Sequence, residues 1–250
     1  MSPFDGANIT YDFNPYTEVV DASVISQWVT YDADMNVTFN QEAVKAYIQT
    51  LADKYNTKGK TRTITTAAGN QATVEGGSYG WQIDQEAEYN ALIANIQNAE
   101  TVTREPAYAS RAASHEGNDY GSTYAEVDLT NQMVYFVQNG QVVLSTACVT
   151  GNPNKGNGTP QGVYSLAYKA LDQVLRGEKL PDGSYSYETP VKYWMPFNGG
   201  IGFHDATWQP TFGGSRYLTN GSHGCVNMPY DMAGQLYNMI SAGTPVVCHY

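Results

Sequence analysis

The chain has 250 residues, 42% of them hydrophobic, which is enough for one large domain or two ordinary ones with packed cores. Its net charge is −11, and residues 1–122 alone carry 16 acids and 7 bases, so the sequence argues against nucleic-acid binding because this surface would repel phosphate. No run reaches about 18 apolar residues, so no membrane span is predicted.

Residues 1–122 mix helix and strand signals. Asn40 and Asp84 are typical helix N-caps. Each precedes apolar residues at helical spacing, namely Val44, Tyr47, Ile48, Leu51 and Tyr55, and then Tyr89, Leu92, Ile93 and Ile96. Residues 61–66 and 71–75 flank an Ala-Ala-Gly-Asn turn and predict a strand pair. We therefore predict an α+β domain over 1–122, with the boundary at the polar run that ends at residue 122.

Residues 123–250 indicate mainly β-structure. Residues 124–137 alternate, Asn139-Gly140 is a strong hairpin turn, and the chain returns as a strand over 141–149. One helix is expected after Pro229. The polar stretch 171–189 is a candidate lid over a site. Further strands are expected at 162–168, 193–197, 202–204 and 246–249, which together predict a mainly-β domain with one C-terminal helix.

One of the three cysteines stands in unusual surroundings. Cys148 and Cys248 lie in strand-like apolar runs, which are typical of buried cysteine. Cys225 instead lies in the run Ser222-His223-Gly224-Cys225-Val226-Asn227. Because a thiol becomes a nucleophile when a neighbouring imidazole takes its proton, this segment predicts covalent catalysis at Cys225.

Two histidines compete for the role of general base. His223 is constrained by its short tether to Cys225, whereas His204 lies 21 residues upstream on a separate predicted strand. We favour His204, oriented by a backbone carbonyl near Asp205, and His223 then polarises the substrate carbonyl or supports the thiolate. Gly224 lets the loop approach the substrate, and the backbone N–H groups of Gly224 and Cys225 are candidate oxyanion donors.

Blander interpretations remain open. Two histidines and a cysteine are also zinc ligands, with Cys248 or His249 as a fourth, although the His-Gly-Cys spacing lacks a common zinc pattern. Between the two halves of the motif lie Trp208, Arg216 and Tyr217, which are candidates to line a substrate cleft. Packing alone would also explain Trp208 and Tyr217.

The order of these motifs resembles the signature of YkuD-type L,D-transpeptidases. His204 is followed by seventeen residues and then by the Ser-His-Gly-Cys-Val-Asn run. Upstream, residues 149–151 (Val-Thr-Gly) and 159–164 (Thr-Pro-Gln-Gly-Val-Tyr) resemble that family's TG … TPxGxY stretch. Residues 123–250 carry this resemblance, which implies a YkuD-like β-sandwich or barrel. Residues 1–122 resemble, by order and general pattern, the peptidoglycan-binding domain that precedes it in Gram-positive members.

The resemblance implies a β-lactam-insensitive enzyme that cross-links peptidoglycan. Cys225 would attack the carbonyl after the third residue of a tetrapeptide stem, D-Ala would leave, and an amine of a second stem would resolve the thioester into a 3→3 cross-link. His204 would accept and donate the proton, and the pocket and oxyanion site would be completed by Ser222, His223 and Gly224. Asn227 occupies a motif position that is Arg or Asn in relatives and is assigned to substrate binding.

The same resemblance implies the partners and the location. Peptidoglycan stem peptides are the expected partners, carbapenems are expected to acylate Cys225, and no cofactor or metal is expected. We expect action at the extracytoplasmic face of the membrane or in the cell wall. Because the chain opens abruptly on Met1-Ser2-Pro3-Phe4 with no signal peptide, membrane association is expected only through a missing N-terminal anchor.

Two other functions compete with this one. An L,D-carboxypeptidase or another cysteine hydrolase would use the same acyl-enzyme with water as acceptor. Papain-like peptidases are disfavoured because they place Cys near the mature N-terminus, whereas Cys225 follows both candidate histidines. A non-catalytic wall-binding protein would have no need of the Ser-His-Gly-Cys loop.

Overall fold

The computed structural model describes residues 6–250, which form two compact units. The first unit contains the chain up to Lys58 and Gly80–Gly121, and the second contains Gly59–Tyr79 and Ser122–Tyr250. The chain start on which we based the missing anchor lies outside the described residues. Within residues 6–250, no helix has both the length and the apolar character needed to cross a membrane.

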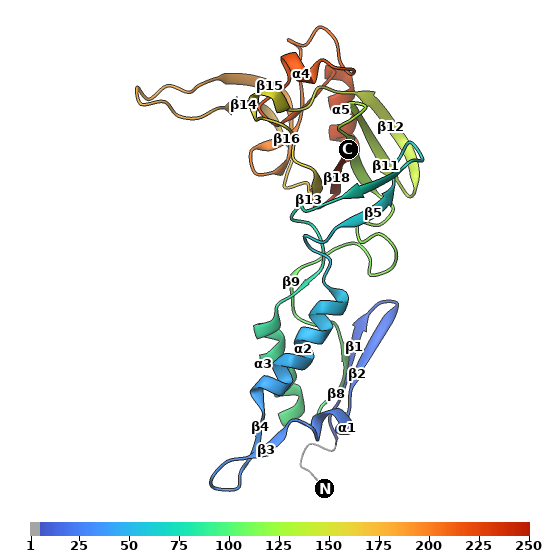
Figure 1. The fold of residues 1–250 in the computed structure, drawn as a ribbon, viewed down its shortest axis with the longest axis vertical. Helices are drawn as coiled ribbons and strands as arrows, with labels where there is room; N and C mark the ends of the chain where they lie inside the picture. Colours follow the sequence, from blue (N-terminus) through green and yellow to red (C-terminus); the bar gives the residue numbers. More distant parts are fainter. Residues whose placement is uncertain (1–5) are drawn as a thin grey trace. The chain divides into compact units, whose positions relative to one another are not determined.

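The first unit is an α+β domain (Figure 1). Its central sheet has the order β2-β1-β8, with β1 and β8 parallel. Both predicted N-caps are confirmed, because Asn40 Oδ1 accepts the Ala43 N–H at 3.2 Å and Asp84 Oδ1 accepts the Ala87 N–H at 3.0 Å. The elements are β1 Asn8–Phe13, β2 Tyr16–Val20, α1 Ala22–Ile25, β3 Val29–Tyr31, β4 Val37–Phe39, α2 Gln41–Tyr55, β7 Gln82–Ile83, α3 Gln85–Gln97, β8 Thr101–Arg104 and β9 Tyr108–Ser110.

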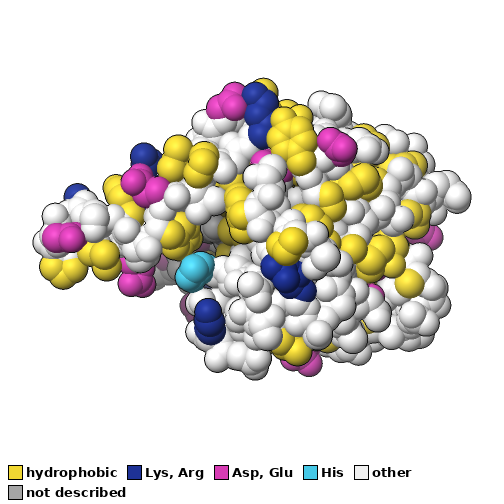
Figure 2. Space-filling view, turned by 90° about the horizontal axis from the view of Figure 1, so that it is seen from above, with side chains coloured by type: hydrophobic (Ala, Val, Ile, Leu, Met, Phe, Trp, Pro, Cys, Tyr) yellow, Lys and Arg dark blue, Asp and Glu magenta, His cyan; other side chains and the backbone are white. Residues whose placement is uncertain are grey.

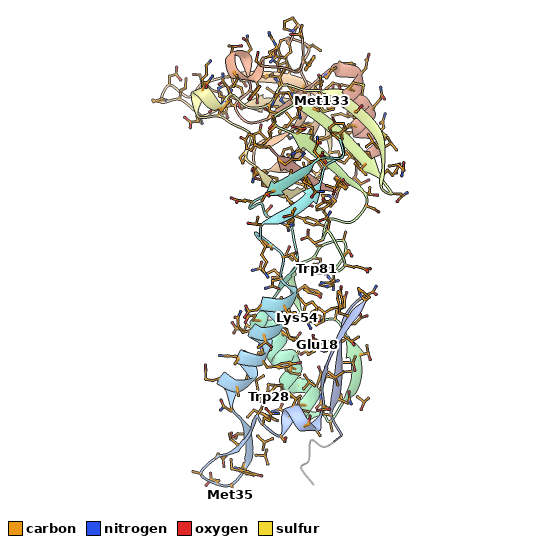
Figure 3. The ribbon with its side chains drawn as sticks, turned by 45° about the vertical axis from the view of Figure 1, so that its right-hand side comes forward. Glu18, Trp28, Met35, Lys54, Trp81 and Met133 are labelled. Atoms are coloured by element: carbon orange, nitrogen blue, oxygen red, sulfur yellow. The ribbon has the colours of Figure 1, made fainter. Side chains whose placement is uncertain are left out.

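Polar contacts tie these helices to the sheet. The fully buried Glu88 of α3 accepts hydrogen bonds from Tyr11 of β1 at 2.5 Å and from Arg104 of β8 at 2.7 Å. In Figure 3, Lys54 of α2 and Glu18 of β2 lie beside each other, and their side chains form an ion pair at 2.5 Å. Burying a carboxylate requires such partners, so Glu88 fixes the packing of α3 on this sheet.

The second unit is a mainly-β sandwich closed by one long helix, α5. A five-stranded sheet has the order β12-β11-β10-β18-β13, and a four-stranded sheet has the order β14-β15-β16-β17. Apolar side chains of both sheets and of α5 form one buried core. The elements are β5 Arg62–Thr65, β6 Gln71–Val74, β10 Tyr124–Asp128, β11 Met133–Gln138, β12 Gln141–Ala147, the 3₁₀ turn η1 Pro153–Lys155, β13 Gly162–Ser165, β14 Ala170–Arg176, β15 Glu188–Asn198, β16 Ile201–Asp205, α4 Tyr217–Asn220, β17 Val226–Met228, α5 Tyr230–Met239 and β18 Pro245–His249.

The structure differs from the sequence prediction over residues 124–137, which form two strands instead of one. The turn between β10 and β11 contains neither glycine nor proline. It is held by Gln132, which adopts a φ of 57° and donates from Nε2 to the Leu129 carbonyl at 2.7 Å. Gln132 Oε1 also accepts the Thr150 N–H at 2.9 Å. Asp128 adds a local contact, because its Oδ1 accepts the Asn131 N–H at 2.8 Å, so the turn rests on a local polar pattern together with the contact to Thr150.

The predicted strand pair at 61–75 forms as the β5–β6 hairpin, but it packs in the second unit. The Ala67 N–H, in the hairpin turn, lies 2.9 Å from both carboxylate oxygens of Glu126 on β10. Glu126 is fully buried and also contacts His249 Nε2 of β18 at 3.1 Å. A stretch that the sequence analysis placed in the first domain thus completes the second.

Candidate active site

The parallel pair β16–β17 places the predicted histidine and cysteine on one face. Phe203 pairs with Val226 and His204 pairs with Asn227. Successive residues of a strand face opposite sides, and paired residues of neighbouring strands share a side. The register therefore places one pair in the core and the other pair on the opposite side of the sheet. Phe203 and Val226 are fully buried in the core. Their neighbours His204, Cys225 and Asn227 therefore point to the other side, where all three line one cleft.

A compact hydrogen-bonded loop leads into the thiol. The Ser222 hydroxyl donates to the Cys225 carbonyl at 2.6 Å and accepts the Gly224 N–H at 3.0 Å. Gly224 adopts a φ of 125°, a conformation that L side chains rarely reach. The Gly224 N–H, which the sequence suggested as an oxyanion donor, is therefore already bound to Ser222, and the Cys225 N–H is left as the candidate donor.

The upstream TG … TP stretch lies directly behind this loop. The Thr159 hydroxyl donates to the Gly224 carbonyl at 2.7 Å and accepts the Gly151 N–H at 2.9 Å. Gly151 packs so closely that a Cβ there would lie 2.8 Å from the Gly224 Cα. Since C=O and N–H point in opposite directions across a planar trans peptide, the Cys225 N–H points away from Thr159.

His204 is held in one tautomer. Its side chain is only 3% exposed, and Nδ1 lies 2.8 Å from the Asp205 carbonyl oxygen. Because a carbonyl only accepts, Nδ1 carries the proton and Nε2 is left as an acceptor. This carbonyl is the orienting partner that the sequence analysis expected. Burial lowers the pKa of His204, against the raising effect of the same carbonyl, so the imidazole is neutral at pH 7.

The Cys225 thiol is protonated at rest. Its Sγ donates to the Gly200 carbonyl at 3.5 Å. Burial raises the pKa of Cys225 to about 11, which outweighs the lowering effect of a hydrogen bond from the Gly202 backbone N–H. A base must therefore take the thiol proton as the nucleophile attacks.

The predicted lid over 171–189 is a β-hairpin that forms one wall of the cleft. In Figure 1, β14 and β15 project together from the sheet. Leu175 and Thr189 are cross-strand partners, and both line the cleft. Tyr187 also lines it and stacks on the exposed His223 ring, with ring centroids 4.8 Å apart and planes at 23°.

The cleft has a volume of about 390 Å³. Of the residues proposed for substrate contact, Trp208, Arg216 and Asn227 line the cleft, whereas Tyr217 does not. Several further residues line the cleft that were not named from the sequence, although three of them lie in the candidate lid over 171–189. These are Lys155, Leu175, Tyr187, Thr189, Gln209, Thr219, Asn220 and Gly221.

Asn227 carries an unusual side chain for a buried position. It is 2% exposed, and its Oδ1 has no hydrogen-bond partner among residues 6–250. An unpaired buried acceptor costs free energy, so it is normally satisfied by a water or a ligand. Because Asn227 also lines the cleft, we expect a molecule bound there to supply the missing donor.

The zinc interpretation gains no support from the described residues. Within residues 6–250, no three His, Cys, Asp or Glu side chains are grouped in a way that would hold a metal ion. Cys248 is buried in the apolar core, and His249 contacts Glu126.

Comparison with known proteins identifies both parts of the chain. Residues 122–248 match the family described as "L,D-transpeptidase catalytic domain" (YkuD), and residues 6–104 match the family described as "Putative peptidoglycan binding domain". None of the curated proteins compared matches the chain.

Solved structures resemble the chain over nearly its whole length. A Cys-to-Ser mutant of the Enterococcus faecium L,D-transpeptidase is 35% identical, with a TM-score of 0.79 and coverage of 98% of this chain and 96% of that one. The Ldtfm-avibactam carbamoyl enzyme is also 35% identical, with a TM-score of 0.80 and coverage of 98% and 94%. Because the catalytic-domain family model matches residues 122–248 and these structures are 35% identical over nearly the whole chain, the chain belongs to the L,D-transpeptidase family and joins a YkuD catalytic domain to a peptidoglycan-binding domain.

Proposed function

We propose that this protein forms 3→3 peptidoglycan cross-links through a thioester on Cys225. The observation that carries the proposal is the shared face of β16 and β17, where a neutral His204 with a free Nε2 and a protonated Cys225 line the same cleft. Acyl transfer requires this combination, since the thiol must lose its proton to a base that is held in one orientation.

The first half-reaction acylates the enzyme. His204 Nε2 takes the thiol proton while Sγ attacks the carbonyl of the third residue of a tetrapeptide stem. The bond from that carbonyl to the D-Ala nitrogen then breaks, and His204 returns the proton to the leaving amine. A pKa of about 11 for Cys225 supports proton removal during the attack, because little thiolate exists beforehand.

The second half-reaction transfers the acyl group. An amine of a second stem attacks the thioester and forms the new amide, and His204 passes the amine's proton back to the departing thiolate. A hydrolase would use water at this point and would leave a monomeric product. In both half-reactions a negative oxygen develops, and the Cys225 N–H, aimed by the Thr159–Gly224 hydrogen bond, is the backbone donor that we assign to it.

The remaining motif residues would support this chemistry indirectly. Ser222 holds the loop through its two hydrogen bonds, and His223 with Tyr187 forms an aromatic wall for the stem peptide. A related solved structure is a carbamoyl enzyme formed with avibactam, which supports the proposal that Cys225 reacts with acylating inhibitors; acylation by carbapenems is our expectation from the family resemblance. We place the activity at the cell wall, on the outer side of the membrane, because the substrate is there.

Intact mass spectrometry tests this proposal. The protein and its Cys225→Ala variant are incubated with a disaccharide-tetrapeptide, first alone and then with an amine acceptor. We expect an acyl adduct and free D-Ala from the unmodified protein only, followed by a cross-linked dimer. A monomeric product in the presence of the acceptor would identify a hydrolase, and full cross-linking by Cys225→Ala would refute the site.

A further inference from the structure

The charge of the cleft is opposite to that of the protein. The whole chain has 24 acidic and 13 basic residues. The cleft lining nevertheless includes two cations, Lys155 and Arg216, and no aspartate or glutamate. On the face shown in Figure 2, Lys and Arg side chains are interspersed with Asp and Glu around an exposed histidine, so the reversal of charge is confined to the cleft lining. Such a local reversal of sign favours an anionic group on the ligand.

The acidic residues nearest in sequence to the cleft are turned away from it. Asp205 follows His204, but its Oδ1 accepts the backbone N–H groups of Lys192 and Tyr193, each at 2.8 Å. Glu188, the first residue of β15, lies between the lining residues Tyr187 and Thr189 and faces the opposite side, where its carboxylate pairs with Arg176 at 2.8 Å. Neither carboxylate neutralises the two cations in the cleft.

Arg216 is positioned by a buried amide. Its Nε donates to Gln209 Oε1 at 2.7 Å, and Gln209 Nε2 in turn donates to the Asn220 carbonyl at 2.9 Å. Gln209 is only 9% exposed. The two terminal nitrogens of the guanidinium have no acceptor within residues 6–250, so its fork is oriented and remains available.

Lys155 stands on an element that is tied to the same end of the cleft. It closes the short turn η1, whose Asn154 Nδ2 donates to the Leu218 carbonyl of α4 at 3.0 Å. Arg216 immediately precedes α4. The Lys155 ammonium forms no ion pair in the described part of the chain. The two cations therefore line one cleft from adjoining elements, η1 and the start of α4, and neither has an ion-pair partner within residues 6–250.

We propose that Lys155 and Arg216 form a carboxylate-binding subsite for the donor stem peptide. The inference rests on the proposed function, in which the attacked carbonyl belongs to the third residue and the leaving residue is D-Ala. The D-Ala carboxylate lies one residue beyond the reacting carbonyl, roughly the 3.8 Å that separates consecutive Cα atoms. Another carboxylate along the stem supplies the same chemistry, so the test separates the two sources.

The test compares acylation rates of donors that differ in one carboxylate. Three tetrapeptide donors are used: one with both carboxylates free, one amidated at the D-Ala terminus and one amidated only within the stem. Each is assayed by adduct mass with the unmodified protein, Lys155→Met, Arg216→Met and Arg216→Lys. Lys179→Met is the matched control, because this hairpin lysine does not line the cleft.

We expect the unmodified protein to prefer the donor with the relevant free carboxylate by about tenfold in kcat/KM, since a charge-assisted hydrogen bond is lost with the amide. The preference should fall to near unity in Lys155→Met and Arg216→Met, persist in part in Arg216→Lys and be unchanged in Lys179→Met. Alkylation of Cys225 by iodoacetamide checks that each variant keeps an intact thiol site.

The failures are distinguishable. Equal rates with every donor, or a preference that survives in both Met variants, would overturn the subsite while leaving the proposed function intact. No acylation by any donor, with normal alkylation of Cys225, would overturn the proposed function and the subsite together.

Discussion

Replacing Thr159 by valine tests whether the Thr159 hydroxyl positions the catalytic loop, because residues 222–225 of the loop itself stay unchanged. The Thr159 side chain is 3% exposed, and its hydroxyl bridges the Gly151 N–H and the Gly224 carbonyl. Valine has a similar shape but leaves both backbone groups unpaired. Each buried unpaired group costs about 1–3 kcal/mol, so we expect a loss of about 3 kcal/mol in the free energy of unfolding. For a unit of this size, that corresponds to a fall of about 6–12 °C in Tm.

The same substitution should slow acylation, because the Gly224–Cys225 peptide is no longer held. Removing an oxyanion donor costs about 10²–10³ in kcat, and a donor that is misaligned but present should cost about tenfold to a hundredfold. The assay is adduct formation on Cys225 by mass spectrometry, with thermal unfolding measured in parallel. Thr159→Ser keeps the hydroxyl and should retain both properties. A Thr159→Val protein that is less stable but acylates at the unmodified rate would refute the positioning argument.

Three further expectations follow from buried groups. The Asn227→Ala substitution removes an acceptor that has no partner among residues 6–250. We therefore expect Tm to change by no more than about 2 °C while KM rises about tenfold. A large loss of Tm with a normal KM would contradict this expectation. Since burial raises the pKa of Cys225 to about 11, iodoacetamide alkylation should keep rising from about pH 7 to about pH 10, and a plateau near pH 8.5 would be inconsistent with it. Burial lowers the pKa of His249, but Glu126 outweighs it and the net pKa is raised, so their pairing stabilises the fold fully below about pH 6.5 and is lost as pH rises through the raised value. Glu126→Gln should therefore destabilise the protein more at about pH 6 than at about pH 9 in urea unfolding, and equal losses would argue against the pair.

Local signals predicted what local contacts determine. Asn40 and Asp84 start their helices through their own side chains, and Asn139-Gly140 forms its turn through its own backbone conformation. The family motif was equally informative about the site, since the shared face of His204 and Cys225 follows from one strand register. These features depend on few residues that are close in sequence or carry a distinctive pattern.

The rest depends on contacts between distant segments. The assignment of the β5–β6 hairpin to the second unit involves the Ala67 N–H meeting Glu126, and the turn after β10 is completed by Gln132, which reaches Thr150. Lys155 and Tyr187 line the cleft because η1 and the β14–β15 hairpin converge on it, and of the two only Tyr187 lies in a segment, the candidate lid, that the sequence linked to a site. The position of Tyr217 outside the cleft illustrates the converse, since nearness in sequence to the motif did not bring its side chain to the site.

The β5–β6 hairpin has a consequence for how the protein is made and cut. During synthesis, residues 59–79 leave the ribosome before any residue of 122–250 exists. Until Glu126 has been made, the Ala67 N–H in the hairpin turn therefore lacks the carboxylate that accepts its hydrogen bond in the folded protein. The same interleaving protects the finished protein against a single proteolytic nick. A cut after Gly121 would give two fragments. The first fragment would stay bound to the second through the β5–β6 hairpin, which packs within the second unit. The two units should therefore co-purify after one cleavage.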